Sequence, residues 1–274
     1  MAVEPVRIAG VPVEVSVPAR AGLVAGIAMA GFRGRAASPI ELQVVPYPAL
    51  TVFIDFGDVR LMDDGGVGGG QGVVGLGSAG VRGAGLDVDL LQVRLSPVVA
   101  HGVLEGAPGL GGTVAGLEEF WGGDAARVRE RMHAAGSWEQ RFAIVSGEVM
   151  RRRDVGRTVD PEVEFAWGRI MNSRGRIRVE QLAVETGWSR KRLWARFRAQ
   201  VGMTPKRAAQ LVRFDRAAHL LARGDSAAAV AADCGYADQS HLHRDVMAFA
   251  GLTPSALAVA PWLSVDPIAW ASNG

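Results

Sequence analysis

Apolar and polar residues alternate along much of the chain between Val11 and Leu95, and this is the period of β-strands. The alternation is clearest in Val11–Val17, and later segments are short runs rich in β-branched and aromatic residues. Strands are therefore predicted at Val11–Val17, Glu41–Val45, Leu50–Phe56, Val73–Val74 and Asp87–Leu95. We expect the first part of the chain to be built on these strands.

The segment Asp63–Gly80 interrupts the strands with nine glycines in eighteen residues. Because a segment with so few side-chain atoms cannot pack into a core, we expect a mobile loop. The run Gly65–Gly72 has the composition of a nucleotide-binding loop, but no Gly-Lys-Ser or Gly-Lys-Thr sequence follows it. The loop interpretation is therefore preferred to a nucleotide site.

Beyond Pro97 the apolar residues recur every three or four positions, which is the period of amphipathic helices. Three short helices are predicted by this spacing, at Leu117–Trp121, Ala125–Ala135 and Phe142–Val149. Residues 1–150 are therefore predicted to form an α+β domain, with strands first and helices after. The polar segment Arg151–Arg157 has no periodicity and is interpreted as part of a linker over residues 151–160.

After Asp160-Pro161, a pair typical of a helix N-cap and first turn, the pattern is helical with short breaks. Within Val179–Phe197, the small residue Ala183 is followed four positions later by Gly187. Ala183 lets a second helix cross closely, and Gly187 supplies the left-handed backbone of a sharp corner. This combination predicts a helix-turn-helix unit.

The same pattern returns in Val230–Val246, where Ala231 and Gly235 again stand four positions apart. Two copies at one spacing argue against coincidence. Between them, Thr204-Pro205 opens a helix of roughly twenty residues, which would be about 30 Å long. That length is close to the ~34 Å between successive major-groove faces of B-DNA. A single strut would thus place two recognition helices in two neighbouring major grooves.

Composition and charge agree with a folded protein that has one basic half. The chain is 49% hydrophobic and 21% charged, which suits folded cores. Residues 1–150 carry a net charge of −5 and residues 151–274 a net charge of +7, so a polyanionic partner is expected on the second half.

The cysteine content and the lack of targeting signals indicate the cellular compartment in which the protein is expected. The single cysteine excludes a disulfide framework and favours a reducing compartment, with the cytoplasm as the default. The apolar stretch Ala21–Phe32 is too short to cross a bilayer, and the residues before it lack the basic start of a signal peptide. We therefore expect a cytoplasmic protein, associated with the nucleoid if it binds DNA.

The helical half resembles the AraC-type (AraC/XylS) transcription regulators over about Pro161–Leu257. The matching motifs are Gly202-Met-Thr-Pro205, Arg213 with Ala217 and Leu220-Leu221, Val230-Ala231, Gly235-Tyr236, Asp238–Arg244 and Gly251–Pro254. The resemblance implies an all-α, seven-helix, double helix-turn-helix DNA-binding domain, placed here at residues 161–260. It also implies a bacterial regulator of transcription.

The recognition helices depart from the family at Trp194, Ala195 and Met247, so the base preference cannot be carried over. Ala195 and Met247 stand where basic residues are common in the family. Trp194 could contact a thymine methyl group or belong to the core, and the spacing leaves both readings open. The cap of the second unit, Asp238, follows the family pattern.

Outward positions on the two predicted recognition helices are the candidate DNA contacts. Arg190 and Lys191 lie at the helix end from which side chains reach base edges. Arg244 suits a guanine edge and Gln239 an adenine edge. Arginines in the loop Arg174–Arg178 are expected to meet phosphates. The complete predicted DNA-binding set is Arg174, Arg176, Arg190, Lys191, Trp194, Arg198, Gln239, Ser240, His243 and Arg244.

The first domain is expected to bind an effector or to dimerise. The resemblance implies a sensory role, but residues 1–150 lack the motifs of the sugar-binding cupin version of the family. They look more like the α+β first domain of a subgroup of actinobacterial AraC-type regulators, which has a step such as Phe120-Trp121. A small apolar effector is favoured. The alternative is a constitutive or partner-controlled DNA binder whose first domain only dimerises. Further expected partners are a second copy and, for an activator, RNA polymerase.

An enzyme is not expected. Residues 1–150 contain no cysteine, and His101 and His133 have no evident nucleophile to activate. His241 and His243 are two positions apart on a predicted helix and so point in different directions, which argues against a shared metal. We therefore predict neither a metal nor a cofactor.

Overall fold

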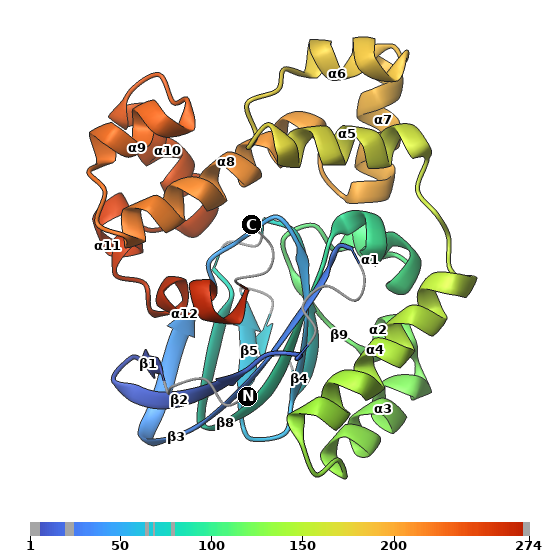
Figure 1. The fold of residues 1–274 in the computed structure, drawn as a ribbon, viewed down its shortest axis with the longest axis vertical. Helices are drawn as coiled ribbons and strands as arrows, with labels where there is room; N and C mark the ends of the chain where they lie inside the picture. The colour runs from blue at the N-terminus through green and yellow to red at the C-terminus, as the bar shows by residue number, and fades with distance from the viewer. Residues whose placement is uncertain (1–5, 20–24, 64–65, 68, 78–79, 271–274) are drawn as a thin grey trace.

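The computed structural model describes residues 6–19, 25–63, 66–67, 69–77 and 80–270. An antiparallel sheet with helices beside it forms the lower part of the molecule in Figure 1, and further helices lie above. The predicted class, an α+β domain followed by an all-α region, is confirmed. None of the described helices combines the length and the apolarity that a membrane span requires.

The described strands form one sheet, and every pair is antiparallel. Its strands are β1 (Val6–Ile8), β2 (Val11–Ser16), β3 (Ile27–Gln43), β4 (Leu50–Asp55), β5 (Arg60–Asp63), β6 (Gly66–Val67), β7 (Gln71–Val74), β8 (Arg82–Leu95) and β9 (Val114–Gly116). The order is β1-β2-β3-β8-β4-β7-β9, and β5 pairs with both β6 and β8. Each of the predicted strands lies in or overlaps one of these.

The sheet buries both of its faces, because neighbouring residues along one strand enter two separate apolar clusters. Phe53 and Leu90 belong to one cluster and are 6% and 3% exposed. Ile54 and Leu91, each one position further on, belong to the other and are fully buried. Since side chains alternate between faces, two-sided burial explains why Leu50–Asp55 shows little alternation of apolar and polar residues.

The helices of the first domain cover the face that holds Ile54 and Leu91. They are α1 (Pro97–Val103), the 3₁₀ turn η1 (Ala107–Leu110), α2 (Glu118–Trp121), α3 (Gly123–His133) and α4 (Trp138–Val155). The three predicted short helices correspond to α2, α3 and α4. The strand β9 was not predicted, because three residues are too few to show a period.

The structure corrects two sequence predictions about connections. First, Arg151–Val155 is helical, because α4 continues to Val155. Arg151 and Arg152 pair with Glu148 one turn earlier, at 2.6 and 2.7 Å, and such pairs stabilise a helix. The connection to the next helix therefore covers only residues 156–160.

The second correction concerns Asp63–Gly80, which is not a single loop. It contains β6 and β7, and β7 is hydrogen-bonded between β4 and β9. Glycine has no side chain to show which face it occupies, so the strand period was hidden. Residues 64–65, 68 and 78–79 of this segment lie outside the described residues. The same holds for residues 21–24 of the apolar stretch Ala21–Phe32, whose end belongs to β3.

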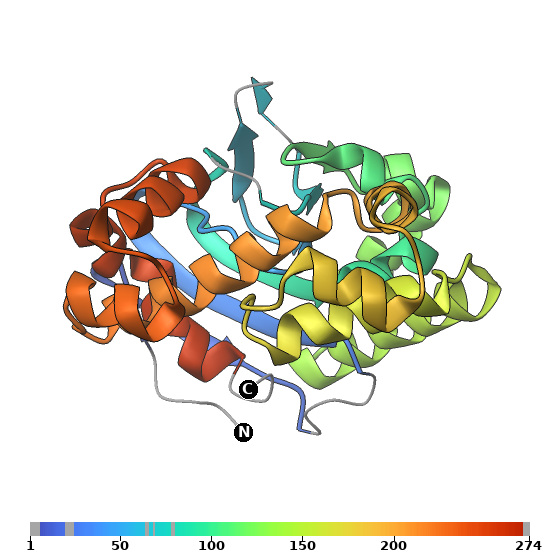
Figure 2. The same cartoon turned by 90° about the horizontal axis from the view of Figure 1, so that it is seen from above.

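The second part of the chain consists of helices in its described residues. They are α5 (Pro161–Asn172), α6 (Val179–Thr186), α7 (Arg190–Val201), α8 (Pro205–Ala222), α9 (Ala227–Cys234), α10 (Gln239–Ala250), α11 (Pro254–Ala258) and α12 (Pro261–Ala269). The strut α8 has 18 residues, which gives a length of about 27 Å. Seen from above, it lies across the sheet (Figure 2).

The last helix, α12, returns to the first domain. In Figure 1 it lies between α11 and the strands β1 to β3. Val265 and Trp270 are 1% and 8% exposed, and they share an apolar cluster with Val15 and Phe32 of the sheet. The helix α12, which follows the predicted DNA-binding domain, therefore completes the core of the sheet domain.

We expect Val265→Asp to destabilise the whole protein. A carboxylate at this position would be buried without a partner among Ile8, Val13 and Phe32, with a cost of about 3 kcal/mol or more. Val259→Asp is the matched control, because Val259 lies just before α12 and is 79% exposed. Thermal unfolding checks both variants. Equal melting temperatures for the two would contradict the docking of α12.

Candidate nucleic-acid interface

Both predicted helix-turn-helix corners have the expected backbone geometry. Gly187 and Gly235 are left-handed, with φ of 68° and 74°. After each corner a side chain caps the next helix. Ser189 Oγ accepts a hydrogen bond from the Arg192 amide at 3.2 Å, and Asp238 Oδ1 accepts one from the His241 amide at 2.7 Å. Two complete half-motifs are therefore formed, α6–α7 and α9–α10.

The inward residues of the two recognition helices, α7 and α10, are those that the spacing predicts. Leu193, Phe197, Leu242 and Val246 are fully buried. Trp194, whose position the sequence left open, is 45% exposed, and the Arg198 guanidinium lies 5.2 Å from its ring centroid. Trp194 is therefore a surface residue rather than a core residue.

The other candidate contacts on α7 and α10 are also exposed. They are Arg190, Lys191, Arg198, Gln239, Ser240, His243 and Arg244. Two of them have local partners in the free protein. Arg190 lies 3.3 Å from Glu180 in an ion pair between exposed side chains, and Arg244 Nε donates to the Ser240 carbonyl at 3.3 Å. An exposed ion pair of this kind contributes little to stability, so Arg190 can exchange its partner at small cost.

The three arginines of the loop between α5 and α6 are exposed but not equivalent. Arg174 has a positive φ of 54°. Arg176 Nη2 donates a hydrogen bond to the carbonyl of Asp233, at the end of α9. Arg178 precedes α6 as its N-cap residue. The predicted phosphate contacts therefore lie on the surface, but Arg176 already has a partner in the other half-motif.

The DNA-binding region contacts the sheet domain through the C-terminal ends of its recognition helices. Beyond α7, Gly202 is packed against Pro108 of η1, where a Cβ would lie 3.0 Å from the Pro108 carbonyl oxygen. At the end of α10, the carbonyl of Ala250 accepts a hydrogen bond from the Gln43 side chain. The N-terminal ends, which carry Arg190 and Gln239, therefore remain exposed.

A pocket of about 940 Å³ lies between the strut, α5, α12 and the sheet domain. Val99, Trp167 and Met171 are among its apolar walls, and Arg94 and His219 are among its polar ones. This pocket could not be predicted from the sequence, because its lining comes from segments that are distant in the chain. Pockets of several hundred Å³ are typical of small-molecule sites, and the charged side chains in this lining also include Arg153, Arg157 and Glu164.

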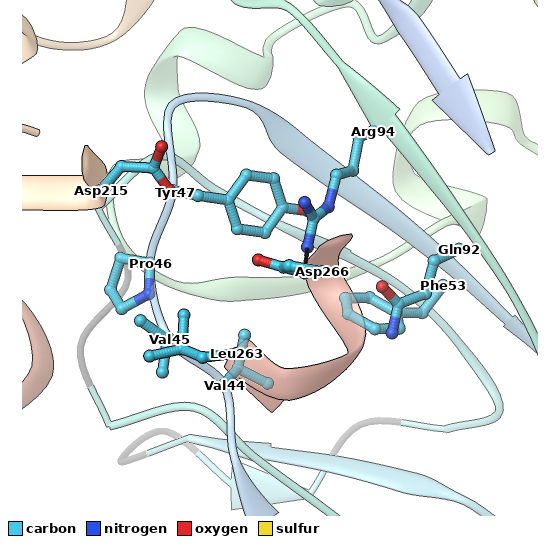
Figure 3. A pocket seen from close by; sticks show the side chains of 10 residues that line it. All are labelled: Val44, Val45, Pro46, Tyr47, Phe53, Gln92, Arg94, Asp215, Leu263 and Asp266. Carbon is cyan, nitrogen blue, oxygen red and sulfur yellow. Dashed lines mark hydrogen bonds and ion pairs between the residues drawn. The ribbon is translucent and has the colours of Figure 1, made fainter. Parts of the chain in front are cut away.

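Arg94 forms the centre of a charged cluster at the wall of this pocket. Its guanidinium lies 3.6 Å from the ring centroid of Tyr47 and 3.9 Å from that of Trp270. It also pairs with Asp266 of α12 at 2.8 Å. Figure 3 shows Tyr47, Arg94 and Asp266 side by side around a smaller cavity of about 30 Å³. Arg94 comes from β8, so it joins the sheet domain to the last helix.

The cluster continues to the strut through His219. Nε2 of His219 lies 3.0 Å from Asp266 Oδ2, and Nδ1 lies 2.8 Å from the Asp215 carbonyl oxygen. Both ring nitrogens thus face acceptors, as in a protonated imidazole. Burial alone would lower the pKa of His219, but the bond to Asp266 and the charge of Asp215 outweigh it and raise the pKa to about 9.

The pKa values of the two acidic partners of His219, Asp215 and Asp266, shift in opposite directions. Burial raises the pKa of Asp215 to about 6, although the His219 charge opposes this shift. Burial also acts to raise the pKa of Asp266, but Arg94 and His219 outweigh it and hold the pKa below its usual value. At neutral pH the cluster therefore contains the ion pairs Arg94–Asp266 and His219–Asp266.

Comparison with known proteins supports the assignment of the helical region. Residues 182–258 match a family model described as a helix-turn-helix domain. No curated protein matches the chain. Similar solved structures include ToxT from Vibrio cholerae O395, which is 10% identical with a TM-score of 0.47 and covers 85% of this chain and 97% of its own. They also include the C-terminal domain of AraT, a response regulator from Geobacillus stearothermophilus. It is 20% identical with a TM-score of 0.35 and covers 36% of this chain and 85% of its own. A third is the AraC-like transcriptional activator CuxR. It is 19% identical with a TM-score of 0.34 and covers 73% of this chain and 79% of its own.

The domain match and the two corners define a helix-turn-helix DNA-binding protein. Residues 182–258 form a helix-turn-helix domain of the AraC type, and an antiparallel sheet domain lies on its N-terminal side.

The raised pKa of His219 predicts a pH-dependent stability. The contribution of a group with a raised pKa is fully present below its unfolded value of 6.5 and is lost as the pH rises through about 9. The free energy of unfolding of the wild type, relative to His219→Gln, should therefore fall between these pH values by up to about 3 kcal/mol. Urea unfolding of both proteins at pH 6.5, 8 and 9.5 measures the difference. A difference that stays constant or grows with pH would contradict the assignment.

Proposed function

We propose that this protein binds duplex DNA specifically through two neighbouring major grooves, and that a small molecule bound between its domains changes its affinity for DNA. The observation that carries the proposal is the pair of half-motifs on one 18-residue strut. A strut of about 27 Å approaches the distance between successive major-groove faces on one side of B-DNA.

In the proposed complex, the exposed N-terminal ends of α7 and α10 enter the grooves. Arg244 reads a guanine edge and Gln239 an adenine edge, each contact being worth about 1–3 kcal/mol of discrimination. Trp194 supplies an apolar face for a thymine methyl group, since it lies on the surface and not in the core. Arg174 supplies a phosphate contact, which adds affinity at every sequence alike.

The proposed effector occupies the pocket of about 940 Å³. It would touch α1 through Val99, α5 through Trp167 and α8 through His219, and hence both domains at once. A ligand that binds one relative arrangement of the domains better than another shifts the population toward it. The lining suits a molecule with an apolar body and a polar group. The pocket thus favours effector control over a first domain that only dimerises, and the proposal requires no chemical reaction at the site.

The assignment of Arg244 predicts a loss of sequence discrimination. After the preferred site has been selected from random duplexes, Arg244→Ala should bind it about 5- to 100-fold more weakly and should no longer distinguish bases at one position. Arg174→Ala is the control, expected to weaken every sequence to the same extent and to reduce the slope of log affinity against log salt by about 0.9. The assignment of roles fails if both variants lose the same discrimination.

The effector pocket predicts that a side chain at Gly168 blocks ligand binding. Gly168 lines the pocket, and a Cβ there meets no atom within 4 Å. Gly168→Leu should therefore fold, because leucine also favours a helix over glycine, and should abolish thermal shifts produced by a library of small amphipathic molecules. Gly147→Leu is the matched control, since Gly147 lies in α4 away from the pocket and is equally free of neighbours. If compounds that shift the wild type shift Gly168→Leu equally, the effector binds elsewhere.

A further inference from the structure

The loop Ser173–Arg178, which precedes the first half-motif, is attached to the strut. Gly175 lies directly on α8, and a Cβ at this position would stand 2.1 Å from the Ala209 carbonyl oxygen. Its φ of +72° is also in the left-handed region, which glycine adopts without strain. The position therefore requires glycine, and the backbone of the loop lies close against the middle of the strut.

From this base, Arg176 extends to the second half-motif. Its Nη2 donates to the Asp233 carbonyl, and its Nε lies 3.6 Å from the position that a Cβ on Gly235 would occupy. Carbonyls at the end of a helix have no partner within the helix and lie at the negative end of its dipole. A guanidinium is therefore well placed at the C-terminus of α9, beside the corner that leads into the recognition helix α10.

Asp233 connects the same point to the strut. Its carboxylate pairs with Arg216 of α8 at 2.7 Å. The Arg216 hydrogen bond, with a smaller contribution from Arg176, lowers the pKa of Asp233. Arg176, Asp233 and Arg216 thus join the loop before α6, the end of α9 and the strut at one junction.

We infer that Arg176 is a positioning residue that sets the angle between the two half-motifs, and thereby the spacing of DNA half-sites at which both recognition helices bind. The inference rests on the proposed function. A half-motif held by one helix alone can tilt as that helix bends, whereas a second attachment away from the helix axis removes this freedom. Arg176 thus acts through α9 and α10, and not as the phosphate contact that its place in an arginine-rich loop predicts.

The test compares duplexes that carry the two selected half-sites at the preferred spacing and at spacings one base pair shorter or longer. The wild type should bind the preferred spacing most tightly. Arg176→Ala should reduce that preference about tenfold, which corresponds to ~1.4 kcal/mol, and should leave the salt dependence of binding unchanged. Arg176→Lys, which can still donate one hydrogen bond to the carbonyl, should restore part of the preference.

Arg178→Ala is the matched control, because Arg178 is an exposed arginine of the same loop. It should leave the spacing preference unchanged. The inference is overturned if Arg176→Ala keeps the wild-type preference and instead lowers the salt slope by about 0.9, which is the signature of a lost phosphate contact. If Arg176→Ala does not fold, Arg176→Met decides, because its side chain cannot donate the hydrogen bond, and a wild-type spacing preference of this variant overturns the inference. Absence of salt-sensitive duplex binding by the wild type would refute the proposed function itself.

Discussion

The Arg94–Asp266 ion pair is the interaction on which the arrangement of the two domains depends. Arg94 projects from the sheet between the rings of Tyr47 and Trp270, and Asp266 belongs to a helix that follows the DNA-binding region. Both side chains are largely shielded from water, so removal of the Asp266 charge would leave Arg94 buried without its ion-pair partner, which is strongly destabilising. The pair therefore holds α12 in the sheet domain, and His219 extends the connection to the strut.

Because of this joint, the DNA-binding region is attached to the sheet domain at two separated places. The first half-motif rests on η1 near Gly202, the second is held by Gln43 at the end of α10, and α12 contacts the strut and the sheet. The strut spans the distance between them (Figures 1 and 2). Asp215 and His219 of the strut line the large pocket. A molecule in that pocket would contact both domains, and this is the physical basis of the proposed effector control.

Much of the helical region could be predicted from the sequence, because its determinants are local. Gly187 and Gly235 specify their corners through backbone conformation, and Ser189 and Asp238 cap the next helices within three residues of themselves. The strands in which apolar and polar residues alternate could also be predicted from the sequence. β7 was only partly recognised and β6 was missed, because glycine carries no pattern. The helical end of α4 was missed because it consists of polar residues whose ion pairs, not burial, support it.

The sequence by itself determined that this protein has two helix-turn-helix units on one strut, with Arg190 and Arg244 on outward faces, since helix periodicity and corner glycines act over a few residues. Only the tertiary structure decided that Trp194 is exposed, that Arg176 is bound to the opposite half-motif and that Arg94 and His219 meet between the domains. Those facts depend on contacts between segments far apart in the chain. A local sequence pattern does not determine which distant residue a given side chain will contact.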